Sequence, residues 1–366
     1  MRILIVGAGV AGLSSAVNLG ADGHDVTIVE RAEHSGVNAP PIDVRGDSIA
    51  VADKMGLLEQ IHERRIDMTQ RVQFVDRDGT VAAELPVDEI NDSPDDIEIS
   101  RDDLLTLLRA RLGPSAKLQF CESIAELDDG ASGVAVRFSS GALERYDLVV
   151  GADGMHSAVR QLAFGPERQF LHHLGFYTGM AALPGPHPSD RINPMYNFPG
   201  HIVGIMSYNA KALAFFMFRS PWIDYDYHDL AAKKRILADA FAGHDEWRVA
   251  ELVDAALQDP GLYFDSESQI KMPGWHSGRV VLVGDAAHCA STLSGRGTSL
   301  ALTGAWFLAQ ALREHPGDLS RAWEQYERDQ RPRAVRGQAT AAPGGELLAP
   351  ATQEAIDARN RALTHG

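Results

Sequence analysis

Cysteines and long apolar runs are scarce in this sequence. Only two cysteines occur among its 366 residues, Cys121 and Cys289, and they form neither a CxxC pair nor a disulfide framework. This usage favours a reducing compartment, and we expect a cytoplasmic protein. No apolar run approaches the ~20 residues of a membrane-spanning helix, so we expect no membrane partner. The apolar start, ILIVGAGVAGL, is similar to a short signal peptide, but its glycine spacing leads into a helix and a second strand, which predicts a buried first strand instead.

Lys and Arg are few relative to Asp and Glu, and several common catalytic motifs are absent. Lys and Arg total 34 against 50 Asp and Glu, and the net charge is −16. Binding to nucleic acid or to anionic lipid depends mainly on Lys and Arg, so we expect neither partner. The GxSxG, HExxH and HxxxH patterns are absent, which leaves hydrolase chemistry and the usual helical zinc sites without support. We therefore expect no metal site.

A glycine-rich turn follows the first strand and opens a helix. Residues 2–6 (RILIV) form an apolar run, Gly7-Ala8-Gly9-Val10-Ala11-Gly12 follows, and residues 25–30 (DVTIVE) form a second strand. In such a βαβ unit the first glycine permits a tight turn, the second lets a pyrophosphate approach the backbone, and the third lets the helix pack on the strand. The helix N-terminus at Val10 and Ala11 attracts the pyrophosphate through its partial positive charge.

Glu30 ends the second strand of this unit. Its carboxylate can accept hydrogen bonds from both ribose hydroxyls of an adenosine, and it repels a 2′-phosphate. The turn and the acid together indicate FAD or NAD rather than NADP as the tightly held ligand. On these features alone, a simple NAD dehydrogenase stays open.

Two later strands also end in turns that combine glycine with aspartate. The strand at 146–150 runs into Gly151-Ala152-Asp153-Gly154, and the strand at 279–283 runs into Gly284-Asp285. Ligands bind outside the carboxyl ends of parallel strands, so Asp285 can hold a polyol hydroxyl there. Each of these two turns alone has a purely structural interpretation. Together with the first turn at Gly7–Gly12, in this order along the chain, they indicate one cofactor site.

The remaining pattern predicts helices and an antiparallel insert. Residues 71–85 alternate around Asp78-Gly79, a hairpin signal, and residues 173–220 indicate an antiparallel sheet. Ser100 and Asp103 predict an N-capped helix over 100–112. Residues 46–62 are predicted as a helix that ends in a turn region at Met55-Gly56-Leu57. Further helices are predicted at 228–257, 298–313, 319–342 and 351–363, the last two being separated by Pro343-Gly344-Gly345.

The three motifs resemble those of the single-component (class A) FAD-dependent monooxygenases, the para-hydroxybenzoate hydroxylase-like group that includes the tetracycline-inactivating monooxygenases. The resemblance covers roughly 1–60, 98–165 and 275–335. It implies an α/β fold with an FAD-binding parallel sheet of the Rossmann/glutathione-reductase type, a second, mainly antiparallel substrate sheet, and C-terminal helices. The expected boundaries are 1–72, 96–168 and 273–318 for a discontinuous FAD-binding domain, 73–95 and 169–272 for the substrate domain, and 319–366 for bracing helices.

The resemblance also assigns residues to the cofactor. The glycine motif and Glu30 match the adenosine fingerprint. Arg45 falls where the family chain passes near the flavin ring, which makes it the one candidate for a part in catalysis. The full set implied for FAD is Gly7, Gly9, Val10, Ala11, Gly12, Glu30, Arg31, Arg45, Arg101, Asp153, Gly154, Asp285, Gly295, Gly297 and Thr298.

The stretch Ser294-Gly295-Arg296-Gly297-Thr298-Ser299 leads into the last helix of the cofactor domain. Gly295 and Gly297 let the backbone lie against a flat ring, and the helix that begins near Thr298 aims its positive end at that ring. A reduced flavin carries negative charge over N1 and the C2 carbonyl, so this helix stabilises it. Relatives usually carry proline just before the glycine pair, whereas residues 289–293 (CASTL) contain none.

The reaction implied by the resemblance uses NADH or NADPH, which reduces FAD, and O₂, which adds at the flavin C4a position to form a hydroperoxide that oxygenates a small organic substrate. No second glycine fingerprint is present, so the nicotinamide cofactor is expected to bind transiently. An aromatic or polyketide-like substrate is a family-level expectation. Three alternatives stay open: a flavin dehydrogenase or oxidase, a Baeyer–Villiger or epoxidising enzyme, and a non-catalytic FAD-binding protein. A monomer or a homodimer is expected.

Aromatic side chains in the antiparallel insert are candidates for the substrate pocket. Phe216 and Phe218 share one face of a strand because alternate residues point to the same side, and one face of this sheet would cover the flavin. Core packing is the other interpretation for each of these residues. The candidate set for the pocket is Tyr177, Tyr208, Phe216 and Phe218.

Overall fold

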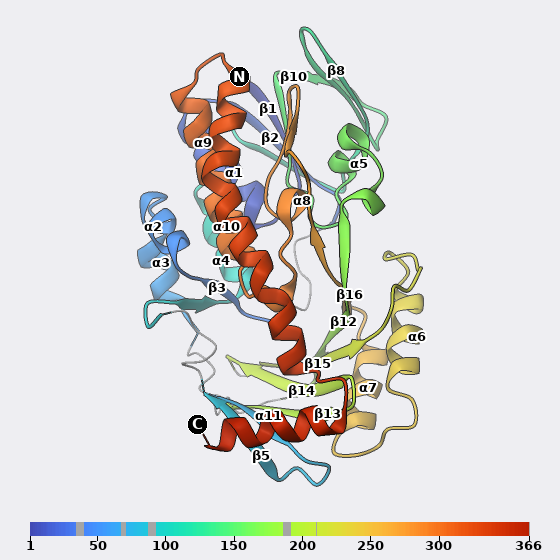
Figure 1. Ribbon diagram of the computed structural model, residues 1–366. Coiled ribbons are helices and arrows are strands. Elements are labelled where there is room, and N and C mark those ends of the chain that lie inside the picture. Colours follow the sequence, from blue (N-terminus) through green and yellow to red (C-terminus); the bar gives the residue numbers. More distant parts are fainter. Residues whose placement is uncertain (34–39, 67–70, 87–92, 186–191, 210, 366) are drawn as a thin grey trace.

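The computed structural model describes residues 1–33, 40–66, 71–86, 93–185, 192–209 and 211–365. Two large sheets, one of six strands and one of seven, lie at opposite ends of an elongated body (Figure 1). Three elements run from one end toward the other, the strands β12 (Leu171–Leu183) and β16 (Tyr263–Ile270) and the helix α10 (Leu319–Leu348). The predicted α/β fold, with a parallel sheet, a mainly antiparallel sheet and C-terminal helices, is confirmed.

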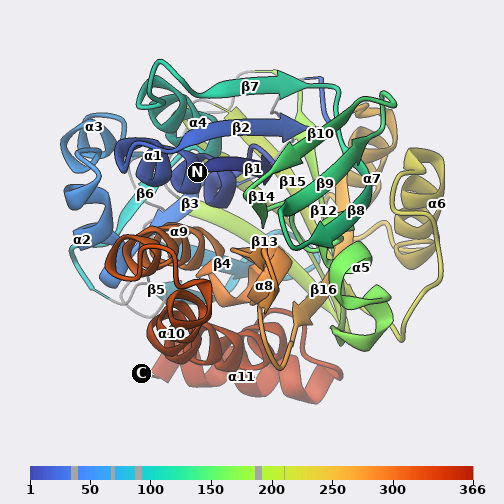
Figure 2. The ribbon, with the colours of Figure 1, turned by 90° about the horizontal axis from the view of Figure 1, so that it is seen from above.

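The six-stranded sheet is parallel except at its edge strand β17. Helices α1 (Val10–Ala21), α4 (Arg101–Ala110) and α9 (Gly297–Glu314) pack together beside it. A separate layer of β8 (Ile124–Gly130), β9 (Gly133–Phe138) and β10 (Leu143–Tyr146) packs on β1 and β11 (Figure 2). Burial on both faces explains the continuous apolar runs of the inner strands. The order is β17 (His276–Ser277), β18 (Val280–Leu282), β11 (Leu148–Gly151), β1 (Arg2–Val6), β2 (Asp25–Glu30) and β7 (Lys117–Phe120).

The seven-stranded sheet contains the predicted antiparallel insert. Its edge is the hairpin of β4 and β5, whose antiparallel pairing around Asp78-Gly79 confirms the hairpin prediction. The helices α6 (Leu230–Ala240) and α7 (Val249–Gln258) cover one face, and their apolar side chains share a core with the sheet. The order is β16, β12, β15 (Lys211–Arg219), β14 (His201–Tyr208), β13 (Ile192–Phe198), β4 (Arg71–Val75) and β5 (Val81–Pro86).

Short elements connect the two sheets. The N-cap prediction for α4 is confirmed, because the Ser100 side chain accepts a hydrogen bond from the Asp103 backbone N–H. Two predicted helices are each split in the structure, at Gly56 (φ 68°) and near Gly243 (φ 81°), because glycine adopts this left-handed conformation readily and so ends a helix. The short elements are β3 (Ile42–Val44), α2 (Asp47–Lys54), α3 (Leu58–Glu63), β6 (Ile97–Ile99), α5 (Ala158–Phe164), η2 (Glu167–Gln169), α8 (Asp285–His288), η3 (Thr292–Ser294) and α11 (Gln353–His365).

The predicted break at Pro343-Gly344-Gly345 is wrong, because α10 continues through all three residues to Leu348. Packing against α9 and η3 holds the helix together despite the hydrogen bond that a proline removes. The bare Cα of Gly345 lets the helix approach the sheet closely, since a Cβ there would lie 2.6 Å from a ring carbon of Phe176. Neither α10 nor any other helix within the described ranges combines the length and apolarity needed to cross a bilayer.

Candidate functional site

The first glycine turn has the geometry that a dinucleotide requires. Gly7 has φ 105°, and a Cβ on it would lie 2.4 Å from the carbonyl oxygen of Ala152. A Cβ on Gly12 would lie 1.9 Å from the carbonyl oxygen of Gly7, so the helix packs on the turn only because this residue is glycine. Gly9 is the N-cap of α1 and supplies no side-chain cap. The first N–H groups of α1, those of Val10 and Ala11 among them, are therefore available to an anion.

Arg101 lies beside this helix terminus although it begins a different helix. Its guanidinium is the atom group nearest to a Cβ built on Gly9, at 4.0 Å. A cation and an uncapped helix N-terminus thus face the same space. This combination suits a diphosphate, which carries two negative charges and several acceptor oxygens.

Glu30 is held in place by backbone hydrogen bonds. One carboxylate oxygen accepts from the Ala8 N–H at 2.8 Å and the other accepts from the Ala32 N–H at 2.9 Å. Each oxygen keeps a further lone pair, so a rigidly placed carboxylate remains able to accept from ribose hydroxyls. Arg31, the next residue, is exposed and interacts electrostatically with Tyr227 and His228 of the insert.

The Asp153-Gly154 turn has a structural role in this fold. The Asp153 carboxylate accepts hydrogen bonds from the Ser157 hydroxyl at 2.5 Å and from the Val159 N–H at 3.1 Å, and so it caps the start of α5. Burial raises the pKa of Asp153. Gly154 has φ 83°, which favours glycine, and a Cβ there would meet nothing within 4 Å. The turn therefore presents bare backbone rather than a side chain.

Asp285 and Arg101 come from different elements and interact electrostatically. The Asp285 residue is exposed, yet desolvation raises the pKa of its carboxyl group, while the positive charge of Arg101 and a hydrogen bond with Cys289 oppose this rise. An acceptor beside a cation fits the polyol chain and diphosphate of FAD.

Arg45 and the start of α9 meet at one junction. The Arg45 guanidinium, only 6% exposed, forms ion pairs with Asp43 at 2.7 Å and Asp96 at 3.8 Å. A Cβ on Gly295 would lie 3.4 Å from this guanidinium. The Ser299 hydroxyl accepts a hydrogen bond from the Arg45 N–H at 3.1 Å, which ties the two segments together.

The N-terminus of α9 is open toward the same region. The helix begins at Gly297, its N-cap Arg296 supplies no side-chain hydrogen bond to the helix, and a Cβ on Gly297 would meet nothing within 4 Å. Gly295 precedes it with φ 59°, and Thr298 occupies the first turn. These residues leave room for a flat ring beside a positive helix terminus, as FAD would require.

The candidates for the substrate pocket do not come together. Tyr177, Phe216 and Phe218 are nearly fully buried among the side chains of α6 and α7, and the Tyr177 ring stacks on Phe218 at 5.6 Å. These three side chains therefore belong to the core of this sheet, which is the other interpretation of their pattern. The alternate residues of β15, Phe215 and Met217, face the opposite side of the sheet.

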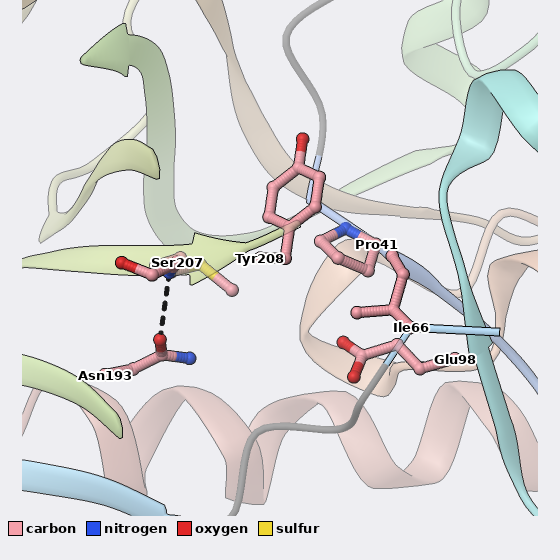
Figure 3. A pocket seen from close by; sticks show the side chains of 7 residues that line it. Pro41, Ile66, Glu98, Asn193, Ser207 and Tyr208 are labelled. Carbon is pink, nitrogen blue, oxygen red and sulfur yellow. Dashed lines mark hydrogen bonds between the residues drawn. The ribbon is translucent and has the colours of Figure 1, made fainter. Parts of the chain in front are cut away.

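Tyr208 alone of the four lines a small cavity between β13 and β14 of the seven-stranded sheet and the residues around β3 and β6 (Figure 3). The cavity lies next to the Arg45 junction, since Pro41 lines it and Asp43 pairs with Arg45. Burial and the Asp102 carboxylate raise the pKa of Tyr208, so its hydroxyl stays neutral. The lining residues are Pro41, Ile66, Glu98, Asn193, Met206, Ser207 and Tyr208.

The chain matches a known family over most of its length. Residues 1–339 match the FAD binding domain family. The chain belongs to this family. Rv1260 from Mycobacterium tuberculosis (strain H37Rv) is 39% identical over 333 residues, which cover 89% of this chain and 86% of the relative. A flavin-dependent monooxygenase from Legionella longbeachae is 35% identical over 329 residues, which cover 89% of this chain and 84% of the relative.

A solved structure shows the same architecture. The tetracycline destructase Tet(55) superposes with a TM-score of 0.84 at 32% identity, over 100% of this chain and 95% of that one. The predictions of the family, of FAD as cofactor and of an FAD-dependent monooxygenase are confirmed by these likenesses.

One residue at this site carries no signal in the sequence. Glu267 lies on β16, far from the three motifs in sequence, and its carboxylate binds the segment that precedes Gly295. The polar run Asp265–Gln269 carries no strand or motif signal, and only the fold brings Glu267 to the segment before Gly295.

Proposed function

We propose that this FAD-dependent monooxygenase takes electrons from NADH or NADPH and inserts one atom of O₂ into a small organic substrate. The balance is one substrate, one O₂, one NAD(P)H and one proton, giving hydroxylated substrate, water and NAD(P)⁺. The observation that carries the proposal is the open N-terminus of α9, with Gly295 and Gly297 bare and the Arg45 guanidinium held beside them. A positive helix terminus there would stabilise the negative charge of a bound, reduced flavin.

Each part of FAD has protein groups suited to it. Glu30 would hold the adenosine ribose, the N-terminus of α1 with Arg101 would hold the diphosphate, and Asp285 would hold the ribityl chain. FAD supplies hydride acceptance and reaction with O₂. The remaining task of the protein is to orient the ring and to exclude water from it.

We propose an aromatic or polyketide-like substrate that binds beside Tyr208, where the small cavity, with room for about one water, would have to widen to admit it. The likeness to tetracycline destructases supports a polycyclic molecule, and the Tyr208 hydroxyl would serve as a neutral hydrogen-bonding partner. Asn193 already uses its side-chain oxygen to accept from the Ser207 N–H at 3.1 Å (Figure 3). It therefore fixes the β14 backbone on which Tyr208 stands.

The test uses the purified holoenzyme, a panel of aromatic and polyketide compounds, and isotopically labelled O₂. NAD(P)H consumption that is stimulated by one compound and yields labelled product supports the proposal. Oxidised product without label would instead establish a dehydrogenase or oxidase, while products of ring expansion or epoxide formation would identify those variants of the chemistry. A protein that binds FAD but never consumes NAD(P)H would be a non-catalytic binder.

A pair of matched variants tests the pocket. Tyr208→Phe removes one hydroxyl at the cavity and should raise KM for the active substrate roughly tenfold, the effect of one buried hydrogen bond. Tyr177→Phe removes a hydroxyl that accepts from the Ile223 N–H at 2.8 Å in the core. It should lower stability and leave KM unchanged. Equal KM values for both variants would place the substrate elsewhere.

We also propose a cytoplasmic location and a monomer or homodimer. Both cysteines are free thiols in the structure, Cys121 exposed and Cys289 buried, which supports a reducing compartment.

A further inference from the structure

Glu267 is a buried carboxylate that gathers four hydrogen bonds. Its residue is 2% exposed. One oxygen accepts from the Thr178 hydroxyl at 2.6 Å and from the Thr292 hydroxyl. The other accepts from the Ser291 hydroxyl and from the Thr292 N–H at 3.1 Å. Three of the four donors therefore come from a single two-residue segment, and a buried charge is stable only with such partners.

The bound segment has a strained backbone. Ser291 adopts φ 76° and ψ 150°, a region that is almost restricted to glycine. Non-glycine residues persist there only when their surroundings fix them. The Ser291 hydroxyl is fixed twice, since it donates to Glu267 and accepts from the Leu293 N–H at 3.3 Å. The contact with Glu267 therefore holds the backbone in its strained conformation.

Neighbouring polar side chains restrain the residues just before Ser291. Gln338 of α10 donates to the Cys289 carbonyl at 3.1 Å, and Gln269 of β16 donates to the Ala290 carbonyl at 3.4 Å. The segment contains no proline that could limit its backbone by itself. Its rigidity comes from side chains on β16 and α10.

The segment leads directly to the open terminus of α9. Thr292 begins η3, Gly295 ends it in the left-handed conformation, and α9 starts at Gly297. Ser294 continues the chain of contacts, because its hydroxyl donates to the Ser291 carbonyl at 2.8 Å and accepts from the Arg296 N–H at 3.1 Å. A shift at Ser291 is therefore transmitted to Gly295.

We propose that Glu267 is a positioning residue, which clamps Ser291 and Thr292 and thereby sets the position of Gly295 and of the α9 terminus against the flavin ring. The inference rests on the proposed function in one respect, that the ring lies beside Gly295. Glu267 acts through this segment and touches no reacting atom.

The first test is Glu267→Gln in the full-length protein. Glutamine keeps the shape of the Glu267 side chain. Its NH₂ group, however, replaces one carboxylate oxygen and cannot accept the hydrogen bonds that this oxygen accepted. We expect about tenfold weaker FAD binding, the effect of losing a charge-assisted hydrogen bond, measured by quenching of flavin fluorescence. The reduction potential of bound FAD should become more negative, and the ratio of H₂O₂ formed to NAD(P)H consumed should rise.

Thr178→Val is the matched control. It removes the one donor to Glu267 that does not belong to the segment, and valine preserves the shape and the buried β-branched packing. The variant should melt at a lower temperature, while its FAD affinity and flavin potential should equal those of the parent protein. If Thr178→Val shifts the potential as much as Glu267→Gln does, Glu267 is merely a stabilising residue and the proposal is wrong.

A double variant supplies a rescue. Thr292→Pro removes the N–H and the hydroxyl that Glu267 binds and leaves its charge poorly paired, so this variant alone should bind FAD weakly. Proline is compatible with the first position of a short helix, so Thr292→Pro combined with Glu267→Val replaces the clamp by a stiff backbone. We expect the double variant to recover most of the FAD affinity that either single change loses. Additive losses would overturn the proposal.

These outcomes are separable from a failure of the proposed function. If the parent protein binds no FAD, the function fails before any variant is compared. If parent and Glu267→Gln bind FAD with equal affinity and equal potential, the function stands and only the positioning role is lost.

Discussion

At the scale of single residues, Asp285 differs from an ordinary exposed acid. Desolvation opposes the charge of its carboxylate and raises its pKa, with Arg101 as partial compensation. An acid whose folded-state pKa is raised takes up more protons when folded, so its contribution to stability falls as pH rises through the unfolded and folded pKa values. On the proposed function, this acid is retained because its carboxylate would bind FAD.

Asp285→Asn should therefore change stability and binding in opposite directions. The neutral amide removes the desolvation cost, and the FAD-free protein should gain roughly 0.5–2 kcal/mol, as is common for changes at binding sites. FAD affinity should fall, since the amide is a weaker acceptor for ribityl hydroxyls. Chemical denaturation without FAD and a binding titration measure the two effects. A loss of stability without FAD would contradict this account of Asp285.

His156 gives a pH-dependent contribution. Burial lowers its pKa, but hydrogen bonds to Asp265 and Glu167 outweigh this and raise the pKa to about 9. The folded state then binds the proton more tightly than the unfolded state does. The resulting stability is fully present below pH 6.5 and is lost as pH rises through about 9.

His156→Gln should consequently cost most at low pH. The difference in unfolding free energy between parent and variant should be roughly 2–3 kcal/mol near pH 6, from about 1.4 kcal/mol per pKa unit, and should shrink toward pH 10. Denaturation curves across this range measure it. A difference that is constant with pH would mean that the histidine is neutral in its pocket.

Sequence patterns nominate candidate cofactor residues but not the side chains that act through tertiary contacts. Glycine turns at the ends of parallel strands are local, so Gly7, Glu30 and Asp285 could be proposed for FAD from order and spacing. Glu267 could not, because its partners lie on β12 and on the segment before α9. The face of β15 was also undetermined, since alternation pairs Phe216 with Phe218 but does not say which layer covers them.

At the scale of elements, α10 shows where local rules fail. Proline and two glycines predict an end of the helix, yet contacts with α9, η3 and Phe176 keep it helical to Leu348. Local propensity is a weak prior that tertiary packing overrides. At Gly56 and near Gly243 the local signal prevails instead. The left-handed backbone of each glycine ends a helix, and no packing contact restores it.

The same substitution should have opposite effects on two helices. Gly345→Ala places a methyl group 2.6 Å from the Phe176 ring. Overpacking of this kind costs about 1–3 kcal/mol, more than the helix propensity gained. Gly20→Ala in α1, where a Cβ meets nothing within 4 Å, should stabilise by about 0.5–1 kcal/mol. Thermal melts of both variants test the pair, and stabilisation by Gly345→Ala would show that α10 sits farther from the sheet.

At the scale of the whole molecule, long elements reach from the seven-stranded sheet toward the six-stranded sheet (Figure 1). β12 pairs with both β15 and β16, and the Gln338 side chain of α10 donates to the carbonyls of Ile270 and Cys289 (Figure 1). These contacts tie β16 and the segment before α9 to α10, which packs on α9 beside the six-stranded sheet. The two ends of the molecule are therefore connected through side-chain and helix contacts.

We expect one cooperative thermal transition for both sheets. Far-ultraviolet circular dichroism and tryptophan fluorescence should give coincident curves. FAD at about 100 times its dissociation constant should shift the whole transition, since it adds roughly 2.7 kcal/mol by mass action. Two separated transitions, only one of which responds to FAD, would show that the sheets unfold independently.

The strand order of the six-stranded sheet has a consequence for biosynthesis. β11 pairs with β1 on one side and with β18 on the other, and residues 152–279 lie between β11 and β18 in the chain. At 5–20 residues per second, the ribosome needs on the order of 10 s to produce that interval. Throughout this time the nascent sheet has an apolar strand with an unpaired edge, which invites association with other chains. We therefore expect the protein to depend on chaperones during translation more than after its release.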